Sequence, residues 1–160
     1  MKGKRILSVI AGMVAGAAGG FAVAGNTIGK NADKYRVMSN KHLSLFLLMN
    51  DWLMVKQEGK SITEYFVKNS YKSIAVYGLS YVGERVLDEL KDSGIEVKYG
   101  IDQNAESIFS DIEVYLPEDE LPEVDAIIVT PVYFFDEIYE MLSDKVRCPI
   151  ISMQDILQDI

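Results

Sequence analysis

Five short segments rich in apolar residues divide the chain from residue 73 onward, and the first of them, Ser73–Tyr77, is an apolar run. Runs of four to eight apolar residues are typical of buried strands, and between these runs the apolar spacing lengthens to the three or four residues of an amphipathic helix. Strands alternating with helices favour a parallel sheet. The expected strands are Ser73–Tyr77, Ile95–Ile101, Ile112–Leu116, Ala126–Thr130 and Pro149–Met153.

Helical periods follow the first, fourth and fifth runs, the last of them over Gln154–Ile160. Residues 117–125 are acidic and hold two prolines, so we expect a short connection or one turn of helix there in place of a full crossover helix, with the charged side chains on a solvated face. Right-handed crossovers then give the strand order 3-2-1-4-5. The predicted fold class is α/β, with a Rossmann-like parallel sheet of about five strands. The helical faces comprise Val82, Val86, Leu87 and Leu90, and Phe134, Ile138, Met141 and Leu142.

Residues before the first strand predict two further helices. Ser61–Glu64 has the spacing of a capping box and opens a short helix through about Lys68. His42–Gln57 is apolar on nearly all sides, which predicts that it is covered on nearly all sides. One face is expected to pack on the α/β domain. The other, within residues 43–55, is expected to meet a sister subunit, giving a homodimer, or the membrane surface.

The N-terminal segment has the layout of a membrane anchor. Lys2, Lys4 and Arg5 precede an uncharged stretch, Ile6–Gly29, long enough to span the hydrocarbon core. Gly12, Gly16 and Gly20 form a small-residue ridge, which either lets membrane helices approach closely or simply fills a weak anchor. The predicted organisation is an anchor over residues 1–30, a linker and apolar helix over 31–60, and a Rossmann-like domain over 61–160. Residues 26–40 are expected to be polar linker.

A cleaved secretory signal is the alternative reading of this segment. Ala22-Val23-Ala24 before Gly25 fits a cleavage site, but the apolar region is long for a signal, so a retained single-pass anchor is favoured. Basic residues lie on both sides of the segment, so charge does not decide its orientation. We expect the C-terminal domain in the cytoplasm because nucleotides are found there; the alternative is secretion after cleavage near Ala24.

Charge is divided unevenly along the 160 residues, whose net charge is −8. Residues 1–69 carry ten Lys/Arg and four Asp/Glu, whereas residues 70–160 carry six Lys/Arg and twenty Asp/Glu. The acidic half disfavours nucleic acid as a partner, and the basic half suits an anionic membrane surface. The single cysteine, Cys148, excludes an intrachain disulfide.

The turn after the first strand carries the candidate chemistry. Gly78 permits a tight turn, Gly83 lets the helix pack close to the strand, and the N–H groups of the first helical turn face an anion. Asp102 ends the second strand nineteen residues after Gly83, at the distance expected for an acid that binds a ribose hydroxyl. This strand-turn-helix pattern resembles the dinucleotide-binding fingerprint, with Ser80 at the position that is normally its second glycine.

Other strand ends supply the rest of the predicted ligand site. The full set is Gly78, Leu79, Ser80, Tyr81, Gly83, Asp102, Thr130 and Tyr133, the two tyrosines being candidates to stack on a base. The alternatives are that Asp102 is a turn residue and that the tyrosines are packed or simply exposed. The Ser80 side chain occupies space that a tightly held pyrophosphate uses. A nucleotide-sugar, a mononucleotide or no ligand is therefore as plausible as NAD or NADP.

Residues Gly78–Gly83 are similar to the Gly-Leu-Gly-Tyr-Val-Gly loop of nucleotide-sugar dehydrogenases, from which they depart at Ser80. Residues Ser61–Ile160 resemble the small Rossmann-like domains of bacterial surface-polysaccharide clusters. Those small domains are similar to the nucleotide-sugar-binding domain of some sugar acyltransferases and to the C-terminal domain of sugar C-methyltransferases. The resemblance implies a role near cell-surface glycan synthesis, with catalysis belonging to another domain.

Catalytic and metal-binding residues are not predicted. There is no Tyr-x-x-x-Lys pattern, His42 lies far in sequence from the glycine turn, and Cys148 has no plausible base. The leading hypothesis is a membrane-anchored, non-catalytic module that binds a nucleotide or nucleotide-sugar as a sensor or accessory subunit. One alternative is a reduced NAD-dependent sugar-nucleotide oxidoreductase or epimerase that completes its site by oligomerisation. Another is a Rossmann-like interaction scaffold with an empty cradle.

Overall fold

The computed structural model describes residues 32–160, which belong to two compact units that divide after His42. The predicted membrane segment Ile6–Gly29 and its small-residue ridge lie outside the described residues. Among residues 32–160, no helix combines the length and the hydropathy that a membrane crossing requires.

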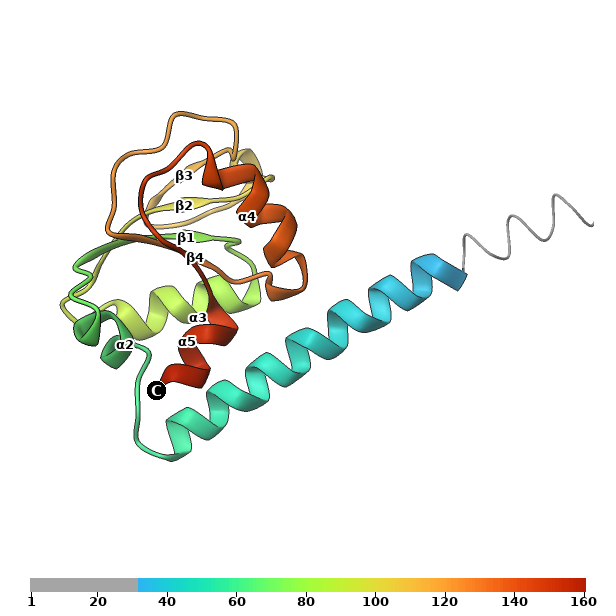
Figure 1. Ribbon diagram of the computed structural model, residues 1–160, viewed down its shortest axis with the longest axis horizontal. Coiled ribbons are helices and arrows are strands. Elements are labelled where there is room, and N and C mark those ends of the chain that lie inside the picture. The colour runs from blue at the N-terminus through green and yellow to red at the C-terminus, as the bar shows by residue number, and fades with distance from the viewer. Residues whose placement is uncertain (1–31) are drawn as a thin grey trace, which may run out of the picture. The chain divides into compact units, whose positions relative to one another are not determined.

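A five-stranded, all-parallel sheet forms the centre of the second unit (Figure 1). Its order is β3-β2-β1-β4-β5, so the predicted fold class and strand order are confirmed. The side chains of β4 are fully buried and those of β1 nearly so, because helices or loops cover both faces of the sheet. The strands are β1 Ser73–Tyr77, β2 Glu96–Ile101, β3 Glu113–Tyr115, β4 Ala126–Val129 and β5 Ile150–Ser152.

Helices divide between the two faces of this sheet. Figure 1 shows α3 and α5 on one face and α4 on the other. The α3 face shares a core with Ile74 and Val76 of β1, whereas the α4 face packs on Ala75 and Tyr77 of the same strand. Alternate residues of one strand therefore feed two separate cores. The helices are α2 Thr63–Lys68, α3 Tyr81–Leu90, α4 Phe135–Ser143 and α5 Met153–Asp159.

Two connections of the sheet contain no long helix. A single 3₁₀ turn, η1 (Ala105–Ser107), lies between β2 and β3, and residues 116–125 link β3 to β4 in irregular conformation. The Tyr99 hydroxyl anchors the second connection by donating to the Pro122 carbonyl at 2.7 Å. Burial raises the pKa of Tyr99 to about 12, and Cys148 and Tyr115 add to the rise.

The acidic connection is not wholly the solvated face that its charge suggests. Asp125 accepts hydrogen bonds from the backbone N–H groups of Ser73 and Lys72, at 2.8 and 2.7 Å. These two bonds lower the pKa of Asp125, because they favour its charged form. Asp125 therefore holds the beginning of β1 beside the beginning of β4.

The helix before α2 is longer than its apolar pattern predicts. It spans residues 32–57 of the described chain and ends before Gly59, which has a φ of +78°. The prediction of a linker over 26–40 is therefore wrong from residue 32 onward. Residues 32–57 contain neither glycine nor proline, and Ala, Lys, Arg and Met are strong helix formers even where no apolar stripe guides them. We refer to residues 32–57 as the first helix.

Glu89 of α3 connects three segments on the α3 face. Its carboxylate accepts hydrogen bonds from Trp52 Nε1 at 2.9 Å, Ser61 Oγ at 2.8 Å and the Ile62 N–H at 3.0 Å. Lys56 Nζ completes the set at 3.1 Å. The first helix and the turn before α2 are thus joined to α3 through one acidic side chain.

The predicted capping box at the beginning of α2 is present in part. The Ser61 N–H donates to Glu64 Oε1 at 3.1 Å, as the motif requires. The Ser61 hydroxyl, however, accepts from the Thr63 N–H and donates to Glu89 instead of bonding Glu64. The Ser61 hydroxyl therefore bonds to α3 instead of capping α2 in the way that the motif predicts.

Candidate functional site

The turn after β1 has the tight geometry that its sequence predicts. Gly78 has a φ of +87°, in the region that favours glycine. A Cβ at this position would lie 2.7 Å from Pro131 Cδ and 2.8 Å from Thr130 Oγ1. The Gly78 N–H donates to the Ile101 carbonyl at 2.8 Å. The turn is therefore wedged between the ends of β2 and β4, and only glycine fits.

Gly83 brings α3 against this turn. A Cβ on Gly83 would lie 2.1 Å from the Gly78 carbonyl oxygen, well inside van der Waals contact. The oxygen is part of the backbone, so it cannot rotate away as a side chain does. The two outer glycines of the predicted motif consequently touch each other, and this contact sets the distance between β1 and α3.

Leu79 contributes backbone rather than side chain to the site. Its side chain is buried in the core beside Gly100, where a Cβ would overlap Leu79 Cδ1. Its N–H donates to Asp102 Oδ2 at 3.0 Å. One of the N–H groups near the beginning of α3 is thus already paired with a carboxylate.

Asp102 clamps two loops at the end of β2. Its Oδ2 accepts from Leu79, and its Oδ1 accepts from the Asn104 N–H at 2.9 Å. These bonds give Asp102 a structural part in the loops, as the alternative of a turn residue supposes. Each carboxylate oxygen accepts two hydrogen bonds readily, so the half-buried group retains capacity for a sugar hydroxyl. Ribose binding stays a prediction.

Ser80 and Tyr81 face solvent at the beginning of α3. Ser80 is the N-terminal cap of the helix, but its hydroxyl makes no capping hydrogen bond. Tyr81 is 78% exposed. Neither side chain fills the space above the turn as part of the core, so both are accessible to a ligand.

Thr130 and Tyr133 follow β4 with different surroundings. The buried Thr130 hydroxyl lies 2.7 Å from the Gly78 carbonyl and 3.2 Å from the Tyr77 carbonyl, and donates to one of them at a time. Tyr133 lies in the 3₁₀ turn η2 (Val132–Phe134), half-buried, with its ring edge-to-face against Phe134 at 5.1 Å. The structure therefore gives Thr130 the role of holding the glycine turn.

Replacing Thr130 by valine is expected to lower the free energy of unfolding by about 1–3 kcal/mol, because the Gly78 carbonyl loses its hydroxyl donor in a buried setting. Thr130→Ser keeps the donor and is the matched control, which should cost less. Urea unfolding of the two variants measures the difference. Equal losses would show that the methyl group, rather than the hydroxyl, holds the turn.

Tyr77 adds a polar group that the sequence did not single out. Its hydroxyl is buried beside the α4 face and, among residues 32–160, lacks a hydrogen-bond partner. Burial raises the pKa of Tyr77; the side chain of Gln103 opposes the rise, and the carboxylates of Asp102 and Glu118 add to it. In the sequence, nothing distinguishes Tyr77 from the other residues of its strand. The burial of its hydroxyl near the end of β2 follows only from the fold.

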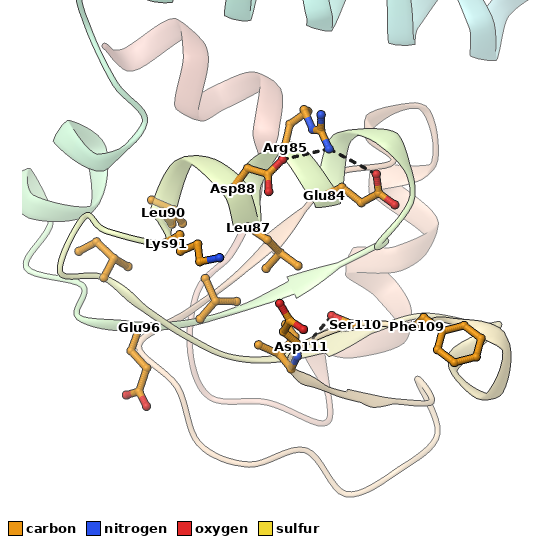
Figure 2. A pocket seen from close by; sticks show the side chains of 13 residues that line it. Glu84, Arg85, Leu87, Asp88, Leu90, Lys91, Glu96, Phe109, Ser110 and Asp111 are labelled. Carbon is orange, nitrogen blue, oxygen red and sulfur yellow. Dashed lines mark hydrogen bonds and ion pairs between the residues drawn. The ribbon is translucent and has the colours of Figure 1, made fainter.

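The basic residue nearest to Gly83 in sequence, Arg85, is paired with acidic neighbours. Its guanidinium lies 3.0 Å from Asp88 and 3.5 Å from Glu84 (Figure 2). It is thereby neutralised on the exposed side of α3. A phosphate at the turn would be held by backbone N–H groups and the helix dipole.

A groove of about 650 Å³ runs along α3 away from the glycine turn (Figure 2). It is lined by α3 from Glu84 to Lys91, by the beginning of β2, and by residues 109–112. The short η1 connection leaves this flank of α3 without the crossover helix that normally covers it. Phe109 is fully exposed at the end of the groove. The absence of a helical period between β2 and β3 is the sequence signal for this feature.

Other reactive residues do not join the turn. Cys148 is half-buried in the core of the α4 face, and burial raises the pKa of its thiol. His42 is exposed on the first helix. Within residues 32–160, no three His, Cys, Asp or Glu side chains gather in a metal-binding arrangement.

The arrangement at the carboxyl edge is therefore a glycine turn, a clamping carboxylate and an exposed helix N-terminus. This set can bind a small anion or a sugar hydroxyl, and it presents no nucleophile paired with a base. In comparisons with known proteins, no family model, no curated protein and no solved structure matches this chain.

Proposed function

We propose that residues 61–160 bind a nucleotide or nucleotide-sugar at the edge formed by the ends of β1 and β2, without catalysing a reaction. The phosphate lies at the N-terminus of α3, and a ribose hydroxyl meets Asp102. The two tyrosines of the predicted site, Tyr81 and Tyr133, flank the base. Through the predicted N-terminal anchor, the module acts at a membrane as an accessory or sensory subunit of cell-surface polysaccharide synthesis.

One observation carries the proposal: the contact between Gly78 and Gly83. A side chain at either position would overlap its surroundings, so the beginning of α3 lies close against the turn at the end of β1. A helix that begins at the carboxyl edge of a parallel sheet presents unpaired N–H groups to an anion. Asp102 lies beside that turn, held by Leu79 and Asn104.

The chemistry of the edge favours a weakly held ligand with few phosphate charges. The Leu79 N–H is occupied by Asp102, and Arg85 is paired with acidic neighbours. The Ser80 hydroxyl offers one hydrogen bond in the place where pyrophosphate needs open space. These features support a nucleotide-sugar or mononucleotide over a tightly bound dinucleotide.

Thermal unfolding of the full chain with NAD, NADP, UDP-sugars, GDP-sugars and coenzyme A tests the proposal. A ligand at about ten times its dissociation constant stabilises the folded state by roughly 1.4 kcal/mol. For a domain of this size that raises Tm by about 5 °C. No shift with any of these ligands, in protein that unfolds cooperatively, would overturn nucleotide binding.

Substitutions at Ser80 separate ligand binding from stability. Ser80 is exposed, has extended backbone dihedrals and makes no capping bond, so neither valine nor glycine should disturb the fold. Ser80→Val is expected to abolish the Tm shift by placing a branched side chain over the helix N-terminus. Ser80→Gly is expected to preserve it and to improve binding of NAD relative to nucleotide-sugars. Identical ligand responses of the two variants would place the ligand elsewhere.

An interaction scaffold is the second candidate, favoured by the exposed apolar side chains of the first helix. Under that function, neither the unsubstituted chain nor the Ser80→Gly variant would respond to a nucleotide, and all three proteins would still assemble with the partner. The same thermal measurements distinguish the two functions.

A further inference from the structure

The first helix presents an apolar face to solvent. Six large side chains between residues 43 and 54 are 37–67% exposed. The opposite side of the same helix is buried against the α/β domain through Leu48, Trp52 and Val55. The exposed set consists of Leu43, Phe46, Leu47, Met49, Leu53 and Met54.

The spacing on this face is that of a coiled coil. Leu43, Phe46, Asn50, Leu53 and Gln57 follow one another at intervals of three, four, three and four residues. This is the a/d repeat of a two-stranded seam, and Leu47, Met49 and Met54 lie on its flanks. Residues 48 and 55, which pack on the domain, fall at the f position, on the far side of the helix from the seam. We call residues 43–57 the seam.

We propose that the seam pairs with the seam of a second copy as a parallel, in-register coiled coil. The proposal does not depend on nucleotide binding. Each domain packs on its own helix through Leu48 and Val55, on the side opposite to the seam.

Asn50 decides between the possible orientations. In a parallel pair it occupies an a position opposite its own counterpart, and the two amides can hydrogen-bond across the seam. In an antiparallel pair an a position faces a d position, which places the amide against Phe46 or Leu53 and leaves it unsatisfied. The polar residue is therefore compatible with the parallel arrangement.

The size of the face agrees with a second copy. Six half-exposed large side chains present on the order of 600 Å² per copy, since a large side chain carries roughly 200 Å². A pair would cover about 1,200 Å², the lower end of specific interfaces. On the flank of the seam, a groove of about 500 Å³ lies between Met49, Trp52 and Leu53 of the first helix and charged residues of α3, and it provides a concave surface for partner side chains.

Charge argues against a lipid surface as the occupant. The domain that is packed on this helix carries six Lys/Arg and twenty Asp/Glu over residues 70–160. An anionic membrane drawn against the seam would meet this acidic domain nearby and be repelled.

Disulfide cross-linking of the full chain tests the pairing. In a Cys148→Ser background, Leu43→Cys places two thiols at the same a layer, within disulfide reach only in a parallel pair. Ser44→Cys is the matched control, one residue along the helix and turned away from the seam. We expect several-fold more disulfide-linked dimer from Leu43→Cys than from Ser44→Cys under mild oxidation. Equal yields would overturn the proposal.

Orientation and association are measured separately. Coexpressed Leu43→Cys and Gln57→Cys chains should form no mixed disulfide; a strong 43–57 product would show an antiparallel pair and contradict the proposal. By light scattering in detergent, Leu53→Glu should convert the dimer to monomer while circular dichroism stays unchanged. Asn50→Leu should strengthen association and broaden the range of oligomers. A Leu53→Glu chain that remains dimeric would place the interface outside the seam.

Discussion

Replacing Gly83 by alanine is expected to lower the free energy of unfolding by about 2–4 kcal/mol, a large share of a typical domain's stability. The new Cβ would lie 2.1 Å from the Gly78 carbonyl oxygen. Relief requires either α3 to move off β1 or the turn to shift. The turn is held by the Thr130 hydroxyl and by the Ile101 carbonyl, so a shift breaks buried hydrogen bonds. The gain of about 1 kcal/mol from alanine's helix propensity does not offset this loss.

Gly94→Ala is the matched control for this substitution. Gly94 has a φ of +82°, and a Cβ there meets nothing within 4 Å. It should therefore cost only the backbone strain, roughly 1–2 kcal/mol. Urea unfolding monitored by circular dichroism compares the two variants. A Gly83→Ala loss no greater than the Gly94→Ala loss would mean that the strand and helix are not held at this distance by the glycine contact.

Removing the Glu89 carboxylate is expected to be the second severe change. Its side chain is 12% exposed, and Glu89→Ala would leave the Trp52 indole N–H, the Ser61 hydroxyl and the Ile62 N–H without their acceptor. Lys56 would also lose its charge partner. Breaking a buried ion pair with several hydrogen bonds costs about 3–5 kcal/mol. Glu84→Ala, an exposed position on the same helix, should cost much less.

The chain's single tryptophan, Trp52, reports on this network directly. Because its indole donates to Glu89, Glu89→Ala should shift Trp52 fluorescence to longer wavelength as the first helix detaches from α3. A variant with native fluorescence and an unchanged unfolding midpoint would show that apolar contacts of Leu48, Trp52 and Val55 alone hold this helix on the domain.

Acid dependence of stability follows from the same residue. Burial raises the pKa of Glu89, but hydrogen bonds from Ser61, Lys56, the Ile62 N–H and Trp52 outweigh it, so the pKa lies below its ordinary value of 4.5. A folded-state pKa below the unfolded one stabilises the protein fully above about pH 4.5, and that stabilisation is lost as pH falls through the lowered pKa. Glu89→Gln should therefore flatten the fall in unfolding free energy below pH 4.5. An unchanged slope would contradict this assignment.

The periodicity of the sequence was sufficient to predict the strands of the sheet and their order. Each of the five strands lies within one apolar run, and right-handed crossovers left one order for them. The signal is densest for β1 and β4, because a parallel strand that is buried on both sides must be apolar on both sides. Gly78 and Gly83 could be predicted for a similar reason, because a tight turn between a strand and a helix requires glycine at particular positions.

Side-chain interactions between segments that are far apart in the chain could not be predicted from the sequence. Asp102 was predicted either to bind a ligand or to be a turn residue, and neither prediction includes its hydrogen bonds to Leu79 and Asn104, which join loops that only the folded sheet brings together. The sequence did not indicate that Glu89 is buried, because an acidic residue on the flank of an amphipathic helix usually faces water. Its four partners come from segments about 30 residues away in the sequence.

The sequence by itself determined the α/β class, the strand order and the glycine turn, because these follow from local periods and from residues with special backbone needs. Only the tertiary structure decided which face of the first helix is buried. The apolar residues on its two sides are equivalent in hydropathy, and the choice depends on the shape and hydrogen-bond acceptors of the domain they meet. Leu48, Trp52 and Val55 lie on the side where Glu89 accepts the indole N–H; Leu43, Phe46 and Leu53 are left for another partner.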